Sequence, residues 1–293
     1  MTACSLVAEL DAAPARPVRC CALSDATTVA PNAASDAALA RAAGYDALEI
    51  QNAKVDVYLW AGGTLGGLRA ALAESHVLPL SLRATPTPSP VSGRDLVLRR
   101  RCFSALCARA TALDCPMVVA EPEATRADTI RTLRALGDVA AEHRVLIGLQ
   151  LDGQPDSAVR TVADAWDVLR QVAHPKLRLI LDTFHFYIGG STWAMLEALD
   201  PDVVGIVRLG DVAARPSSPS GLPFPLRLVP GDGIVPLGQL MRRVEALGCT
   251  PAYSVEMSPA AYPAVSPLAR ARAARASLEA LLAELDELEG RLD

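Results

Sequence analysis

Short apolar runs alternate with longer amphipathic stretches along most of this 293-residue chain. Strands that are buried on both faces of a parallel sheet read as continuous apolar runs, and helices usually connect them. Eight such units are the number that a closed barrel of parallel strands needs. The pattern predicts a protein of the α/β class, a single (β/α)8 TIM barrel, with strands over residues 18–23, 47–50, 78–82, 117–120, 145–151, 177–181, 203–209 and 252–255.

Helical periodicity fills the intervals between these runs. Small polar residues at Ser35-Asp36 and Ser191-Thr192 predict helix starts, because their side-chain oxygens can accept hydrogen bonds from free N–H groups of a first turn. Gly44 and Gly248 predict helix ends, because glycine readily takes the left-handed conformation there. The expected helices cover residues 36–43, 66–75, 96–113, 128–143, 158–172, 192–199, 237–247 and 268–292.

The composition narrows the class of protein. Hydrophobic residues make up 51% of the chain, and a formal charge of −5 without any basic run argues against a nucleic acid partner. Seven cysteines without a C-x-x-C pair argue against a disulfide framework and favour the cytoplasm. Residues 1–17 lack the features of a signal peptide, so we expect a flexible N-terminal extension before a barrel domain over 18–293. No apolar run is long enough to span a membrane.

Polar and ionisable side chains end or follow most of the predicted strands. In a parallel barrel the carboxyl ends of all strands meet at one mouth, and the active sites of barrel enzymes lie there. We therefore expect a site for a small-molecule substrate at this mouth. The candidates are Glu49, Arg83, Glu121, Gln150, Asp152, Asp182, His185, Arg208, Asp211 and Glu256.

Five short motifs carry a resemblance to a known family. They are C-A-L-S-D-A-T-T at residues 21–28, G-Y-D-A-L-E-I at 44–50, L-D-T-F-H-F at 181–186, R-L-V-P-G-D-G at 227–233 and S-V-E at 254–256. Together they resemble xylose-isomerase-like barrels, and most closely the inosose isomerases and 3-dehydroshikimate dehydratases among them. The resemblance implies an isomerase, epimerase or dehydratase that removes a proton next to a carbonyl group. Its substrate would be a small polyhydroxylated carbonyl compound, such as a sugar, a keto-cyclitol or a related cyclohexane acid.

The resemblance also implies a divalent metal, held by a glutamate, an aspartate, a histidine and a second glutamate on strands five to eight. The matching residues here are Gln150, Asp182, Arg208 and Glu256. A guanidinium group has no free lone pair and keeps its charge, so Arg208 cannot bind a cation. We therefore expect no metal cofactor, with Arg208 in the cation's place, either paired with Asp182 and Glu256 or directed at the substrate. The alternative is one divalent metal, such as Mn, Zn or Mg, at Asp182 and Glu256.

The resemblance and the chemistry of these side chains suggest their roles. Glu256 is the expected general base, His185 a second acid or base, and Arg208 the partner of an enolate oxygen, with Asp182 as a fourth catalytic residue. The expected substrate-binding residues are Gln150, Arg227, Glu49, Glu121 and Arg83. Simpler roles stay open: Asp182 would only pair with Arg208, and His185 would only bind backbone. Glu49 would be structural, and Glu121 would belong to a solvated turn.

Two other functions fit parts of the sequence. Loss of two metal ligands would also suit a barrel that has lost the family's activity and binds a small molecule or a protein. Against this, chemistry is favoured by the retained residues Asp182, His185, Arg227 and Glu256. A divergent endonuclease-like barrel is disfavoured, since the chain is acidic and lacks histidine clusters. A homodimer stays open. The proline-rich segment 213–224 is expected to cover part of the mouth as a lid.

Overall fold

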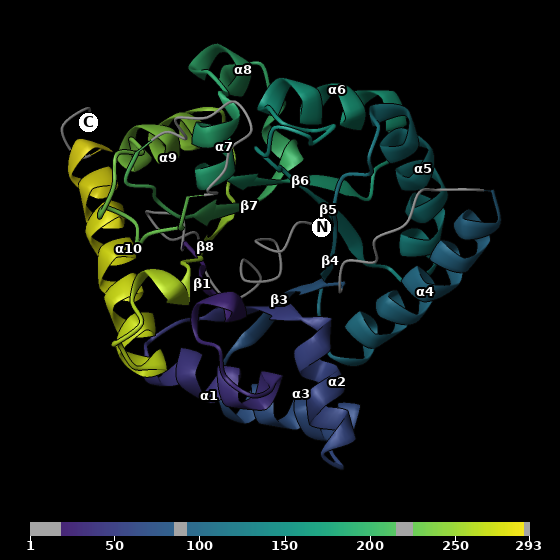
Figure 1. The fold of residues 1–293 in the computed structure, drawn as a ribbon, viewed down its shortest axis with the longest axis horizontal. Coiled ribbons are helices and arrows are strands. Elements are labelled where there is room, and N and C mark those ends of the chain that lie inside the picture. The colour runs from purple at the N-terminus through teal and green to yellow at the C-terminus, as the bar shows by residue number, and fades with distance from the viewer. Residues whose placement is uncertain (1–18, 85–92, 215–224, 290–293) are drawn as a thin grey trace, which may run out of the picture.

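Eight parallel strands close into one barrel in chain order, and β8 pairs back to β1 (Figure 1). The computed structural model describes residues 19–84, 93–214 and 225–289. The strands are β1 (Cys21–Ser24), β2 (Ala47–Gln51), β3 (Leu78–Arg83), β4 (Met117–Ala120), β5 (Leu146–Gln150), β6 (Leu177–Asp182), β7 (Val204–Leu209) and β8 (Ala252–Val255). Each predicted run overlaps one of them, so the predicted (β/α)8 fold is confirmed.

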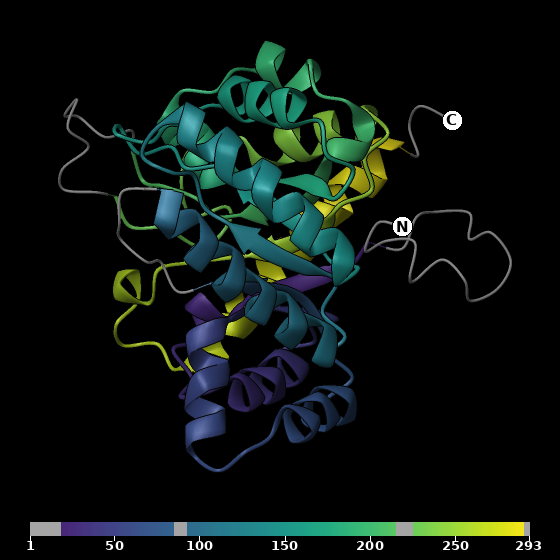
Figure 2. The same ribbon diagram turned by 90° about the vertical axis from the view of Figure 1, so that its right-hand side faces the viewer.

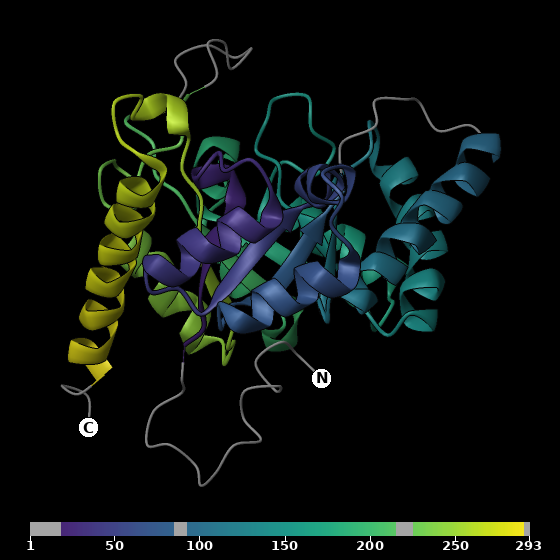
Figure 3. The ribbon, with the colours of Figure 1, turned by 90° about the horizontal axis from the view of Figure 1, so that it is seen from below.

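Helices surround the barrel on its outside (Figures 1 and 2). The last and longest helix, α10, runs along this outer surface and contacts α1 and α9 (Figure 3). The helices are α1 (Ala33–Ala42), α2 (Asn52–Trp60), α3 (Leu65–Glu74), α4 (Gly93–Ala112), α5 (Arg126–Glu142), α6 (Val162–Val172), α7 (Thr183–Gly189), α8 (Trp193–Glu197), α9 (Leu237–Ala246) and α10 (Pro267–Glu289). None of the described helices is long and apolar enough to cross a membrane.

Two of these helices, α2 and α7, were not expected from the sequence. Both follow a strand without any intervening loop, so the sequence contains no turn residues that would predict a helix start there. Arg109 on α4 holds α2 through an ion pair with Asp56, in which Nη1 and Oδ1 are 2.6 Å apart. The carboxylate of Asp182 caps α7, since it accepts a hydrogen bond from the backbone N–H of His185. Tertiary contacts and this local cap therefore explain both helices.

The predicted helix boundaries were partly right. Thr192 caps α8 as expected, and Gly44 and Gly248 follow helices with φ angles of +84° and +80°. The expected start at Ser35-Asp36 was wrong, because α1 begins at Ala33. Its cap is Asn32, whose side chain accepts a hydrogen bond from the Ser35 N–H group, so an equally good capping residue lies one turn earlier.

The barrel interior is apolar at its lower level and charged at its mouth. Every strand contributes at least one apolar side chain to a small core cluster inside the barrel. The cluster consists of Ala22, Ala47, Leu80, Met117, Val119, Leu146, Ile180, Ile206 and Ala252. Side chains alternate along a strand, so residues two positions further on also face inward. Ile180 is followed in this way by Asp182, and Ile206 by Arg208. The charged residues thus take the place of the uppermost interior layer.

Two expectations lie outside the described part of the chain. The N-terminal extension over residues 1–17 precedes it, and residues 215–224 of the expected lid fall in its second gap. Both stay predictions.

Candidate active site

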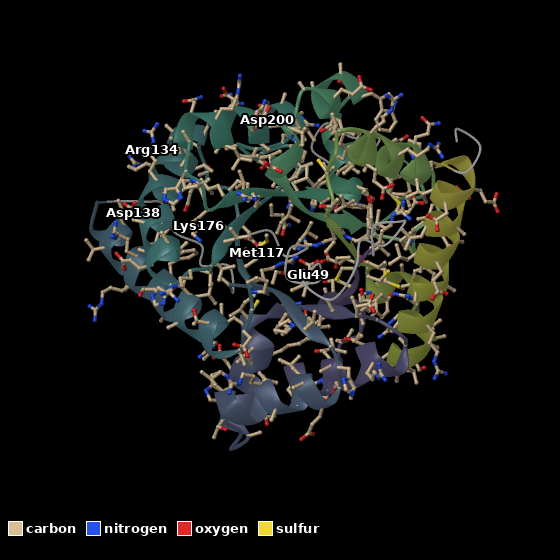
Figure 4. The ribbon with its side chains drawn as sticks, turned by 180° about the vertical axis from the view of Figure 1, so that it is seen from behind. Glu49, Met117, Arg134, Asp138, Lys176 and Asp200 are labelled. Atoms are coloured by element: carbon tan, nitrogen blue, oxygen red, sulfur yellow. The ribbon has the colours of Figure 1, made fainter. Side chains whose placement is uncertain are left out.

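Arg208 lies at the centre of the mouth and is fully buried. Its main partner is Glu49, with Nε and Nη2 at 3.0 and 2.7 Å from the two carboxylate oxygens. Its Nη1 donates to Gln150 Oε1 at 3.0 Å and lies 3.7 Å from Asp182 Oδ2, while Nε lies 3.5 Å from Glu256 Oε2. Figure 4 shows Glu49 within the ring of strands. Asp182 and Glu256, the expected partners, are therefore secondary to Glu49, which we had expected to bind substrate.

A second guanidinium group reaches the same carboxylates from the loop after β7. Arg227 Nη1 donates to Asp182 Oδ1 at 2.7 Å, and its Nε lies 3.4 Å from Glu256 Oε1. The guanidinium also stacks over the ring of Phe184, 4.6 Å from its centroid. Arg227 is 7% exposed, so it borders the mouth where Arg208 does not.

A buried carboxylate folds the loop that carries Arg227. Asp211 pairs with Leu228 as an isolated antiparallel bridge. Its two side-chain oxygens accept hydrogen bonds from four backbone N–H groups, those of Val212, Gly231, Gly233 and Val235. A Cβ atom at Gly233 would collide with this carboxylate, so glycine is required there. The sequence placed Asp211 at a strand end but did not show that it organises a loop.

Glu256 is surrounded by donors on every side. Besides Arg208 and Arg227, it accepts hydrogen bonds from Ser24 Oγ at 2.8 Å and Arg83 Nη2 at 3.3 Å. Burial alone would raise the pKa of the Glu256 carboxyl, but the three arginines lower it far below its usual range. Glu256 is therefore ionised at neutral pH and its lone pairs are engaged.

The other two carboxylates of this cluster behave in the same way. Burial opposes the charge on Glu49, yet Arg208 lowers its pKa; for Asp182, Arg227 has the larger of the guanidinium effects. Glu49, Asp182 and Glu256 are thus balanced by Arg83, Arg208 and Arg227, and the cluster as a whole is neutral. Such mutual compensation is what allows charged groups to stay buried.

His185 sits beside this cluster with a fixed tautomer. Its Nδ1 accepts a hydrogen bond from the Gly153 N–H group at 3.0 Å, so the neutral ring carries its proton on Nε2. Burial lowers the pKa of His185, although Asp182 and Asp152 favour the charged form. A Cβ at Gly153 would collide with the His185 carbonyl, so this approach also requires glycine. At neutral pH, His185 is a hydrogen-bond donor rather than a cation.

The remaining predicted residues form the rim of the mouth. The side chains of Arg83 and Asp152 are 19% and 25% exposed, and Gln150 is also half-buried. Glu121 follows β4 and is exposed. Although the residue is exposed, neighbouring protein groups partly desolvate its carboxyl, which raises the pKa of Glu121; Arg83 and Arg208 oppose this shift and Asp152 adds to it.

The residues at the positions of the family's metal ligands do not fit a divalent cation. The Arg208 guanidinium occupies the space between Gln150, Asp182 and Glu256, with a nitrogen within 3.7 Å of each. No group of three or more His, Cys, Asp or Glu side chains in the described segments is arranged to hold a metal ion. A fixed positive charge at this point would repel a cation.

A second buried cluster supports the β1 side of the mouth and was missed by the sequence reasoning. Asp25 accepts hydrogen bonds from the backbone N–H and the side-chain Nε2 of Gln51 at 2.8 and 3.0 Å. Lys54 Nζ lies 2.8 Å from Asp36 and 3.8 Å from Asp25. Burial raises the pKa of Asp25 to about 6, despite the nearby Lys54. Only the motif at residues 21–28, which includes Asp25, pointed to this loop.

A closed parallel barrel with converging charged groups at the carboxyl ends of its strands defines a barrel of the enzyme type. The chain belongs to the xylose isomerase-like TIM barrel family, whose model matches residues 37–284. An inosose isomerase of Halalkalibacterium halodurans is 28% identical over 227 residues, which cover 73% of this chain and 78% of that protein. An inosose isomerase of Bacillus licheniformis is 27% identical over 248 residues, which cover 80% and 87%. The expected family resemblance is confirmed.

Solved structures agree on the fold. The IolI protein, crystallised with a bound zinc atom, superposes with a TM-score of 0.82 at 24% identity, over 90% of this chain and 98% of that one. AsbF of Bacillus anthracis, described as a probable 3-DHS dehydratase, superposes with a TM-score of 0.71 at 13% identity, over 90% of this chain and 99% of that one. At these identities the likeness shows a shared fold.

Proposed function

We propose that this protein is an isomerase or epimerase, or alternatively a dehydratase, that acts on a small polyhydroxylated carbonyl compound. The similarity to two inosose isomerases supports a sugar-like or keto-cyclitol substrate. The rim supports the same class, since Gln150, Asp152 and Glu121 offer hydrogen-bond acceptors for hydroxyl groups. The cations near the mouth are already balanced by carboxylates, which favours a neutral substrate over an acid.

One observation supports chemistry without a metal: Arg208 lies, fully buried, among the residues that match the family's metal ligands. IolI holds zinc, and this chain would hold a guanidinium group instead. Because Arg208 is not accessible, it is a positioning residue that acts through Glu49, Gln150 and Glu256. Asp182 is likewise buried and acts by orienting Arg227.

The substrate carbonyl oxygen would bind to donors that reach the mouth. Arg83 and Arg227 both flank Glu256, and Arg83 is the more accessible of the two, with 19% of its side chain exposed against 8% for Arg227. The Nε2–H group of neutral His185 is a third donor, which can stabilise an enolate oxygen without giving up its proton. These donors lower the energy of the enolate that forms when a base removes the neighbouring proton.

Deuterium uptake tests this function directly. Protein dialysed against EDTA is incubated in D2O with inosose or D-psicose, and uptake next to the carbonyl group is followed by NMR. We expect uptake that persists after chelation, together with far less than one equivalent of Mn, Zn, Co or Mg in the untreated protein. Uptake that returns only after metal is added would refute the metal-free mechanism. Binding of these ligands in calorimetry with neither deuterium uptake nor isomer formation by NMR would favour the second function, a barrel that binds but does not turn over.

A further inference from the structure

We propose that Glu121 is the general base of this site and that it carries a proton between two adjacent substrate carbons on one face. This inference rests on the isomerase function proposed above. Glu121 follows the last residue of β4 directly, and Met117 and Val119 on that strand belong to the interior cluster of the barrel. Side chains alternate along a strand, so Glu121 extends inward at the mouth like its two predecessors.

The position of Glu121 compensates for the missing strand-five carboxylate. In the β4–β5 ladder Ala120 is opposite Leu149, so the next residues, Glu121 and Gln150, are neighbours. In the closed strand order β4 is four strands away from β8 in either direction. Glu121 and Glu256 therefore stand on opposite sides of the mouth.

The surroundings of Glu121 and Glu256 differ, as expected if one is the acid–base group and the other a fixed charge. Glu256 has four donors around it and is held ionised, so it is a poor proton acceptor. Glu121 has no hydrogen-bond or ion-pair partner within the described segments and is accessible to substrate. The charged groups that act on it are Arg83, Asp152 and Arg208, and its pKa is raised where that of Glu256 is lowered. Opposite shifts of this kind separate a working acid–base group from a fixed charge.

The proton transfer balances without any further reactant. Glu121 takes the proton from the hydroxyl-bearing carbon beside the carbonyl group, and the electron pair of that C–H bond forms the C=C bond of an enediolate. The hydroxyl proton passes to the former carbonyl oxygen. The second oxygen then becomes the new carbonyl oxygen, while the former carbonyl carbon takes the proton back from Glu121. Both proton positions lie on the face of the substrate that Glu121 reaches.

Glu121→Gln tests this role with the D2O assay on inosose. General bases contribute about 100-fold to 10,000-fold, so deuterium uptake should fall by at least about 100-fold. The thermal midpoint should not change, because Glu121 bonds to no described residue. The matched control is Glu123→Gln, two residues further on, whose carboxylate pairs with Arg99. This variant should keep the wild-type rate of uptake.

The remaining outcomes separate the two proposals. Partial recovery of uptake in Glu121→Asp would support a base at this position. Active wild-type protein whose uptake survives Glu121→Gln within about two-fold, well below the contribution of a general base, would refute the role of Glu121 and leave the isomerase function standing. Wild-type protein that gives neither deuterium uptake nor conversion of inosose or D-psicose to an isomer would refute the isomerase function and the role of Glu121 together.

Discussion

Removing the positive charge of Arg208 should destabilise the fold strongly. Arg208→Met keeps much of the side-chain volume but leaves three buried carboxylates facing two guanidinium groups. Glu49 would lose both of its bonds to Arg208, at 3.0 and 2.7 Å, in a site where Arg208 is fully buried and the Glu49 side chain is 4% exposed. Breaking a buried ion pair in this way costs about 3–5 kcal/mol. With a denaturant slope of about 3 kcal/mol per molar, the urea midpoint should fall by about 1–2 M.

Urea unfolding followed by tryptophan fluorescence and circular dichroism measures this loss. The double variant Arg208→Met with Glu49→Gln removes one charge of each sign and should recover most of the midpoint. As a surface control, Arg131→Ala removes an exposed pair with Asp128 and should change stability by less than about 1 kcal/mol. If Arg208→Met were no more destabilising than Arg131→Ala, the ion pairs of Arg208 with the buried carboxylates would not contribute measurably to the stability of the fold.

Three further changes test other parts of the site. The pKa of Asp25 in the folded protein, about 6, lies above its ordinary value of 3.8. Protonation of Asp25 therefore adds stability that is complete below pH 3.8 and is lost as the pH rises through 6. Free energies of unfolding at several pH values should show wild type losing stability relative to Asp25→Asn over this range. Asp211→Asn replaces one acceptor oxygen by a donor NH2 group, so two of the four backbone N–H groups bonded to Asp211 lose their acceptor. This loss should cost about 2–6 kcal/mol and speed hydrogen exchange at Gly231 and Gly233. Unchanged exchange would show that Asp211 does not hold this loop. Arg208→His with Gln150→Glu restores two ligand types and should give Zn²⁺ or Mn²⁺ binding by calorimetry that wild type lacks; no binding would mean that Arg227 alone blocks the site.

The strands could be predicted because each is buried on both faces and therefore apolar. The helices that follow β2 and β6 directly could not, because the residues that stabilise them come from elsewhere or serve two purposes. Asp182 is the clearest case, since its carboxylate caps α7 and also binds Arg227. A sequence motif shows that such a residue is present without showing which of its bonds matters.

The sequence predicted which residues lie at the mouth of the barrel more completely than it predicted which of them pair with each other. Except for Arg227, which lies in the loop after β7, the expected residues end or closely follow strands at one mouth, and the structure brings Arg208 close to Asp182 and Glu256. Glu49 as the main partner of Arg208 could not be foreseen, because β2 and β7 lie far apart in the chain and their separation across the barrel depends on closure. The role of Asp211 in its loop depends likewise on hydrogen bonds from backbone N–H groups, which the identities of the side chains do not reveal.

The two departures from the family's ligand pattern compensate each other electrostatically. In the proposed metal-free site, the absence of a divalent cation would remove two positive charges from the mouth. A glutamine in place of the strand-five glutamate removes one negative charge, and an arginine in place of the strand-seven histidine adds one positive charge. Under this proposal the buried cluster would keep the net charge that it would have with a metal, in agreement with the lowered pKa of Asp182 and Glu256. Either substitution alone would leave an unbalanced charge among groups that water does not reach, so Gln150 and Arg208 are best understood as one change.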